Sequence, residues 1–103
     1  MLNQVVLVGR LTKNPEVKTL DSGKKVSNVT LAIPRTFKNN NGVYDTDFIK
    51  CTLWDNMALN TKEYCKQGSI LGVKGRLETT VKDDKFYSDV IAEKVTFLSG
   101  SKE

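Results

Sequence analysis

Aromatic and basic residues are interleaved in one stretch of the chain, residues 31–54, and this combination suggests a surface for nucleic acid. The aromatic members are Phe37, Tyr44, Phe48 and Trp54, and the basic members are Arg35, Lys38 and Lys50. Flat rings can stack on bases, and neighbouring cations can neutralise phosphates. The stretch therefore predicts binding to a single strand with little base preference, since every base has a face on which to stack.

The alternation from Phe48 to Trp54 predicts a strand with two different faces, because side chains two residues apart point the same way. One face carries Phe48, Lys50 and Trp54, and the other carries Ile49, Cys51 and Leu53. A core aromatic seldom shares its side of a strand with a lysine. We therefore expect the first face to be a rigid platform in solvent. Arg35, Phe37, Lys38 and Tyr44 are expected to form a mobile flap beside it.

Turn signals divide the chain into short strands and one helix. Strands are predicted at residues 3–11, 17–20, 25–34, 48–54, 69–77 and 88–98, with a helix from Asp55 or Asn56 to about Lys66. Gly9 is interpreted as a bulge or bend, Pro34 as the end of regular pairing or the mark of a strand edge, and Asn41-Gly42 as the turn of a long arm. About five strands with one helix between the third and the fourth predict an all-β fold, a five-stranded OB-fold barrel with a long β-hairpin arm. The domain is expected to cover residues 1–99, with a frayed end at 100–103.

Composition sets only broad limits on the function. The chain has 103 residues, 39% of them hydrophobic, and a formal net charge of +4, which is mild. No apolar run approaches the roughly 18 residues needed to span a bilayer, so we expect no membrane association and a cytoplasmic, nucleoid-associated protein. Cys51 and Cys65 are too far apart for a CxxC motif and are interpreted as small buried hydrophobes.

Groups that could support catalysis are few. The chain has no histidine, and no nucleophile or phosphate-loop motif is present. Asp45 with Asp47, and Asp83 with Asp84, are the only close carboxylate pairs, and both fall in predicted turns where acids are usually solvated. We therefore expect no enzyme, no metal and no cofactor. A metal-dependent nuclease at either pair is the enzymatic alternative.

Further basic residues extend the candidate surface. Lys74 and Arg76 alternate with apolar residues in the strand at 69–77, so both should point to one side. A tight hairpin at residues 81–86 carries Lys82, Lys85 and Phe86, which complete the candidate site. Tyr64 and Phe97 are assigned to packing. The lysines assigned to the solvated surface are Lys18, Lys24, Lys25, Lys62, Lys94 and Lys102.

Several segments together resemble the bacterial and phage single-stranded DNA-binding proteins over essentially the whole chain. They are residues 2–11 (LNQVVLVGRL), 14–16 (NPE), 29–32 (VTLA), 52–54 (TLW), 64–69 (YCKQGS) and 75–77 (GRL). The resemblance implies single-stranded DNA as the partner, protected during replication, recombination, repair or DNA uptake. It also implies a homotetramer, a dimer of dimers whose first strands meet, which would cover the apolar run at residues 5–8 on both faces.

The resemblance also assigns roles by position. It implies stacking on Phe37, Phe48 and Trp54, and backbone contacts at or beside Arg10, Lys38, Lys50, Lys66 and Arg76. Lys82 and Lys85 lie on the hairpin that would grip DNA.

Two departures from the family pattern qualify these expectations. Residues 78–82 (ETTVK) carry fewer cations than usual and lack an aromatic, which predicts lower affinity. The Gly/Pro/Gln-rich tail and acidic tip that recruit replication enzymes are not in the sequence, so we expect no tail-mediated partners. The alternative function is a primosome-type OB-fold protein that mainly holds replication proteins together.

Overall fold

The computed structural model describes residues 1–99 and contains six strands and one helix. In chain order these are β1 (Val5–Leu11), β2 (Lys18–Thr19), β3 (Lys25–Lys38), β4 (Tyr44–Trp54), α1 (Asn56–Tyr64), β5 (Ile70–Lys82) and β6 (Lys85–Phe97). The frayed end expected at residues 100–103 lies outside the described residues. No helix among residues 1–99 is long and apolar enough to cross a membrane.

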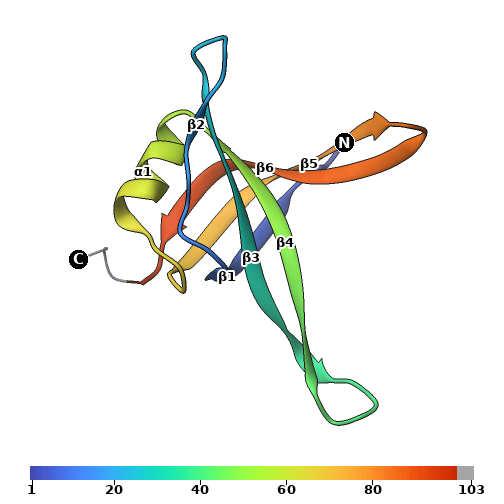
Figure 1. The fold of residues 1–103 in the computed structure, drawn as a ribbon. Helices are drawn as coiled ribbons and strands as arrows, with labels where there is room; N and C mark the ends of the chain where they lie inside the picture. Colours follow the sequence, from blue (N-terminus) through green and yellow to red (C-terminus); the bar gives the residue numbers. More distant parts are fainter. Residues whose placement is uncertain (100–103) are drawn as a thin grey trace.

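The five long strands close into a barrel. They follow the order β1-β5-β6-β4-β3, and β1 also pairs with β3, which joins the two ends of the sheet. Every pairing is antiparallel except that of β4 with β6. The two-residue β2 pairs only with β3. The prediction of a five-stranded OB-fold barrel with one helix is therefore confirmed (Figure 1).

Strand alternation fills the barrel as the sequence predicts. Val29 and Leu31 of β3 and Cys51 and Leu53 of β4 are buried, and each lies one residue away from a position on the outer face. The helix α1 contributes Ala58 and Thr61, both fully buried, and Cys65 follows it into the core. The expectation that both cysteines are buried is confirmed, and both are free thiols.

Two hairpin arms extend from the barrel, one from β3 and β4 and one from β5 and β6 (Figure 1). The prediction that regular pairing ends at Pro34 is confirmed: Pro34 lies opposite Thr46, and the register then shifts before Lys38 pairs with Tyr44. The strand β3 itself continues through this irregularity to Lys38. Proline is tolerated at a strand edge, where its missing N–H leaves no ladder bond unmade.

The second arm is also longer than predicted, since β5 continues to Lys82 and β6 already begins at Lys85. Asp83 and Asp84 form the turn between them, with φ values of 53° and 62°. Two successive residues at positive φ are typical of the two-residue hairpin turns whose twist matches that of the flanking strands.

The helix is shorter than predicted and its start is held differently. It ends at Tyr64 rather than near Lys66, with Cys65 extended at its C-cap. Asp55 occupies the N-cap position but makes no side-chain capping bond; its Oδ1 instead accepts from the Lys25 backbone N–H at 3.1 Å. The residue therefore ties the start of α1 to the start of β3.

Two features of the first strand bear on what was predicted for it. Val6 is 70% exposed and Val8 53% exposed, so within one chain the apolar run is covered on one face only. Gly9 lies in an uninterrupted ladder with β5 and forms no bulge. A Cβ there would lie 2.7 Å from Ile33 Cγ1 and 2.8 Å from the Ala32 carbonyl oxygen, so glycine permits β1 to pass close to β3.

Gly75 provides a sharp test of this packing. It is buried on β5, and a Cβ built there would lie under 3.0 Å from the backbone carbonyl of Ile91, which cannot turn aside. We expect Gly75→Ala to lower the free energy of unfolding by about 1–3 kcal/mol or more, measured by urea titration. The matched control is Gly72→Ala on the same strand, whose Cβ would meet no atom nearer than 3.5 Å. Equal destabilisation by the two variants would contradict this account.

Candidate nucleic-acid interface

The platform, defined as Phe48, Lys50 and Trp54 of β4, faces outward from the barrel. Phe48 is 67% exposed, Lys50 is exposed and Trp54 is half-buried, while Cys51 and Leu53 between them are fully buried. The predicted division of this strand into a core face and a solvent face is therefore confirmed. A cation between two aromatic rings on a rigid strand suits a stretched single strand, whose phosphates and bases alternate.

A buried polar contact anchors the middle of the platform. Thr52 points to the same side as Lys50 and Trp54 but is buried, and its Oγ1 lies 2.5 Å from Asp89 Oδ2 on β6 and 3.1 Å from Asn28 Oδ1 on β3. A hydroxyl has one proton to donate, and we assign it to the charged Asp89 oxygen. The contact joins three strands at the place where β4 and β6 pair in parallel.

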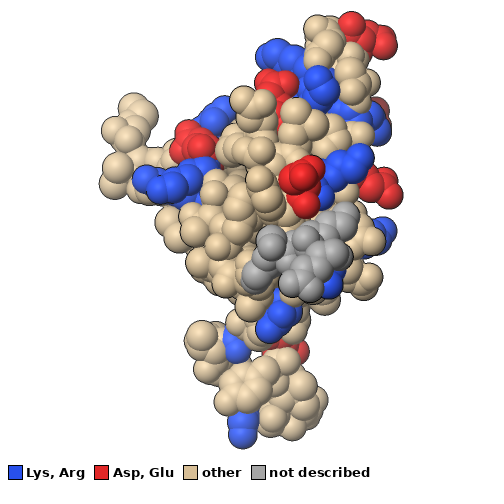
Figure 2. Space-filling view, turned by 90° about the vertical axis from the view of Figure 1, so that its left-hand side faces the viewer, with Lys and Arg blue, Asp and Glu red and all other residues tan. Residues whose placement is uncertain are grey.

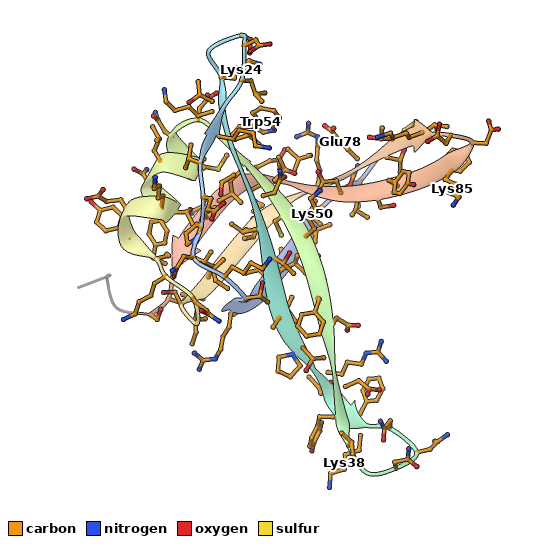
Figure 3. All side chains as sticks on the ribbon, in the orientation of Figure 1. Lys24, Lys38, Lys50, Trp54, Glu78 and Lys85 are labelled. Atoms are coloured by element: carbon orange, nitrogen blue, oxygen red, sulfur yellow. The ribbon has the colours of Figure 1, made fainter. Side chains whose placement is uncertain are left out.

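Lys24 belongs beside the platform, although the sequence analysis assigned it to the general surface. Its Nζ lies 6.0 Å from the centre of the Trp54 ring (Figure 3), within the range of a cation–π interaction. The signal lies in the pairing: Val26 is opposite Trp54, and Lys24 precedes Val26 by two residues. That signal requires the β3–β4 register, which the sequence alone does not supply.

The arm formed by β3 and β4 carries the remaining residues of the predicted flap. Phe37 is 70% exposed, and Lys38 lies opposite Tyr44, with its Nζ 5.8 Å from the centre of the Tyr44 ring. Arg35 is differently placed, because it forms an ion pair with Asp47, with Nη2 3.0 Å from Oδ1 and Nε 3.1 Å from Oδ2. These hydrogen bonds raise the pKa of Arg35 and lower the pKa of Asp47. Asp47 lies opposite Ile33, on the side of the arm facing away from Phe48.

Lys74 and Arg76 both point outward from β5, as predicted, but they have different neighbours. Lys74 lies opposite Val6 of β1 and Lys94 of β6, away from the platform. Arg76 lies opposite Ile91 of β6, and Ile91 in turn lies beside Thr52. Arg76 therefore belongs to the row of residues that crosses the platform.

The sequence analysis assigned Lys82, Lys85 and Phe86 to one site, but on the β5–β6 arm they lie on two different faces. Lys82 and Lys85 are opposite each other at its end, on the face that also carries Thr80 and Tyr87 and continues to Asp89 and the platform. Phe86 lies opposite Val81, on the other face of the arm. Sequence reasoning thus selected Phe86, whereas Tyr87, which is half-exposed, shares the platform side.

Arg10 and Lys66 lie at the connection between α1 and β5. The guanidinium of Arg10 donates from Nη1 to the Gly68 carbonyl oxygen at 2.9 Å, and the Lys66 backbone N–H donates to Ser69 Oγ at 3.0 Å. Arg10 also lies opposite Ala32, and Ala32 lies opposite Phe48. These paired positions connect Arg10 across β3 to the platform.

Acidic residues are distributed among the cations. Figure 2 shows lysine, arginine and acidic side chains interspersed over the face that carries α1, without one continuous basic surface. Asp45 and Asp47 both approach Arg35, and Asp83 and Asp84 form a turn. Among residues 1–99, no group of three or more His, Cys, Asp or Glu side chains is placed to hold a metal ion.

Comparison with known proteins agrees with this geometry. A family model described as the single-strand binding protein family matches residues 2–98. The chain belongs to the single-strand binding protein family. It is 43% identical to single-stranded DNA-binding protein B of Bacillus subtilis (strain 168), in an alignment covering 95% of this chain and 91% of that protein.

Other members of the family are longer. The chain is 46% identical to the single-stranded DNA-binding protein of Halalkalibacterium halodurans, but the match covers 61% of that protein and 95% of this chain. Its fold also matches a crystal structure of a deletion mutant of the single-stranded DNA binding protein from Thermus aquaticus, with a TM-score of 0.80 and 28% identity. That match covers 96% of this chain and 51% of the Thermus chain.

The cysteine beneath the platform gives a pH prediction. Burial, with a smaller contribution from the nearby Asp89 charge, raises the pKa of the Cys51 thiol from 9.0 to about 11. Because the folded pKa is the higher one, the neutral thiol favours the folded state below about pH 9, and this contribution disappears as the pH approaches 11. We expect neither Cys51 nor Cys65 to react with a thiol reagent at pH 8 in the native protein, and both to react in denaturant. Rapid labelling of a native thiol would contradict the buried placement.

Proposed function

We propose that this protein binds single-stranded DNA without base preference, by stacking bases on the platform and neutralising phosphates with lysines. Its relatives in Bacillus subtilis and Halalkalibacterium halodurans are named single-stranded DNA-binding proteins. The observation that carries the proposal is the outward row of Phe48, Lys50 and Trp54 above fully buried neighbours. A preformed row needs no reorganisation before bases stack on it.

The positions of the lysines support a path for single-stranded DNA along the outer surface of the barrel and its arms. Figure 3 shows Lys24 next to Trp54, Lys50 further along β4, and Lys38 and Lys85 at the ends of the two arms. Among residues 1–99, no lysine lies within ion-pair distance of a carboxylate; the salt bridges involve only Arg35 and Arg76. Lysines without acidic partners can exchange solvent counterions for phosphates, which makes the affinity depend on salt.

The same proposal covers assembly and cellular role. Val6 and Val8 of β1 leave an apolar face open on one chain, beside a hollow of about 240 Å³ that Leu98 also lines. Covering this face against a second copy supports a homotetramer built as a dimer of dimers. The protein would act without catalysis, protecting single strands in the nucleoid during replication, recombination, repair or DNA uptake.

The test is an oligo(dT) titration followed by the fluorescence of Trp54, the only tryptophan. We expect quenching on binding and a logarithmic affinity that falls with the logarithm of salt concentration. Because stacking on one ring is worth about 1–3 kcal/mol, Phe48→Ala should weaken binding about 5- to 160-fold.

The matched control is Tyr64→Ala, which removes a ring that packs against Phe97, with ring centres 5.7 Å apart, at the helix. It should leave the affinity nearly unchanged. Mass measurement of the complex returns the subunit number in the same experiment. Absence of quenching in the wild type, or equal affinity for duplex DNA, would contradict the proposal; tight helicase binding with negligible strand binding would favour the primosome-type alternative.

A further inference from the structure

Two carboxylates hold Arg76, which is connected across β6 to Thr52 in the platform strand. Its Nη2 donates a short hydrogen bond to Glu78 Oε2, and its Nη1 lies 3.6 Å from Glu93 Oε2. All three side chains are about half-exposed, so solvent and a ligand can reach the pair. The guanidinium therefore has two acidic partners within the same chain.

The register places this ion pair beside the path proposed for DNA. Thr52 lies beside Ile91, and Ile91 lies opposite Arg76, so two strand spacings, about 10 Å, separate Arg76 from the platform strand. Glu78 lies opposite Asp89, whose side chain contacts Thr52. Figure 3 shows Glu78 on the part of the β5–β6 arm nearest to Lys50 and Trp54. A phosphate that reaches Arg76 must also approach these carboxylates.

We propose that Glu78 limits the affinity of this interface for single-stranded DNA by holding Arg76 in an intramolecular ion pair. This inference rests on the proposed function and adds an affinity-determining residue to it. Glu78 occupies one of the five N–H donors of the guanidinium, and its charge repels a phosphate that approaches the remaining donors. Arg76 thus contributes less to the affinity for single-stranded DNA than a cation without an acidic partner would at the same position.

The decisive variant is Glu78→Gln, which keeps the size of the side chain and removes its charge. The guanidinium, which then keeps only its longer 3.6 Å contact with Glu93, should add one phosphate contact and raise the affinity for oligo(dT) about three- to tenfold at 50 mM salt. One added contact should also steepen the log–log salt dependence by about 0.7. The gain should therefore shrink about 2.5-fold when salt is raised to 200 mM.

Two comparisons separate release of Arg76 from a general change in charge. Glu63→Gln makes the same chemical change on the exposed side of α1 and should alter the affinity less than twofold. Glu78→Gln made in an Arg76→Gln background should give a clearly smaller gain than in the wild type, because there is no guanidinium to release. Circular dichroism melting of each variant checks that it folds.

The outcomes are distinct. An equal gain from Glu78→Gln in both backgrounds, or no change in the salt slope, overturns the proposal. A loss of affinity in Glu78→Gln also overturns it, because Glu78 would then orient Arg76 for binding. If the wild type binds oligo(dT) and Glu78→Gln binds equally well, only this inference fails. If neither the wild type nor any variant binds, the proposed function fails and the inference falls with it.

Discussion

Leu53 and Cys51 are fully buried, and their burial fixes which side chains of β4 point outward. Leu53 lies opposite Ser27 of β3, and Cys51 lies opposite Val29 of β3; both partners are also buried. A slip of one residue in this register would turn Phe48, Lys50 and Trp54 into the core and bring the apolar set into water. The geometry of the interface therefore depends on core packing beneath it, and the platform is as well defined as the barrel itself.

The outward placement of side chains that follows from a single strand could be predicted, and the neighbours that depend on two strands could not. The alternation of β4 alone identifies Phe48, Lys50 and Trp54. The place of Lys24 depends on the register of β3 against β4, and the choice between Phe86 and Tyr87 depends on a two-residue turn at Asp83-Asp84. The fold was predictable because burial patterns and turn residues are local, whereas pairing registers and the extent of the arms depend on contacts distant in sequence.

Arginine and lysine have different roles in this molecule. All three arginines have intramolecular partners: Arg10 donates to a backbone carbonyl, and Arg35 and Arg76 pair with carboxylates. Arginine forms paired hydrogen bonds with the edge of guanine, whereas a lysine ammonium on a flexible stem acts as a point charge towards phosphates. Within residues 1–99 the lysines have no carboxylate at ion-pair distance while the arginines are occupied, an arrangement that suits binding without regard to base sequence.

The ion pair of Arg35 with Asp47 has a structural explanation of its own. The register of β3 against β4 shifts between Pro34 and Lys38, and such irregularities leave ladder groups unpaired and bend the strand. Arg35 lies within that gap and crosses to Asp47, with Asp45 Oδ2 3.9 Å from its Nη1. The ion pair therefore joins the two strands where the backbone ladder is interrupted, and its position on the side away from Phe48 keeps these acids off the platform. The arm can then present Phe37 within the irregular stretch and Lys38 just beyond it, although neither residue packs in the core.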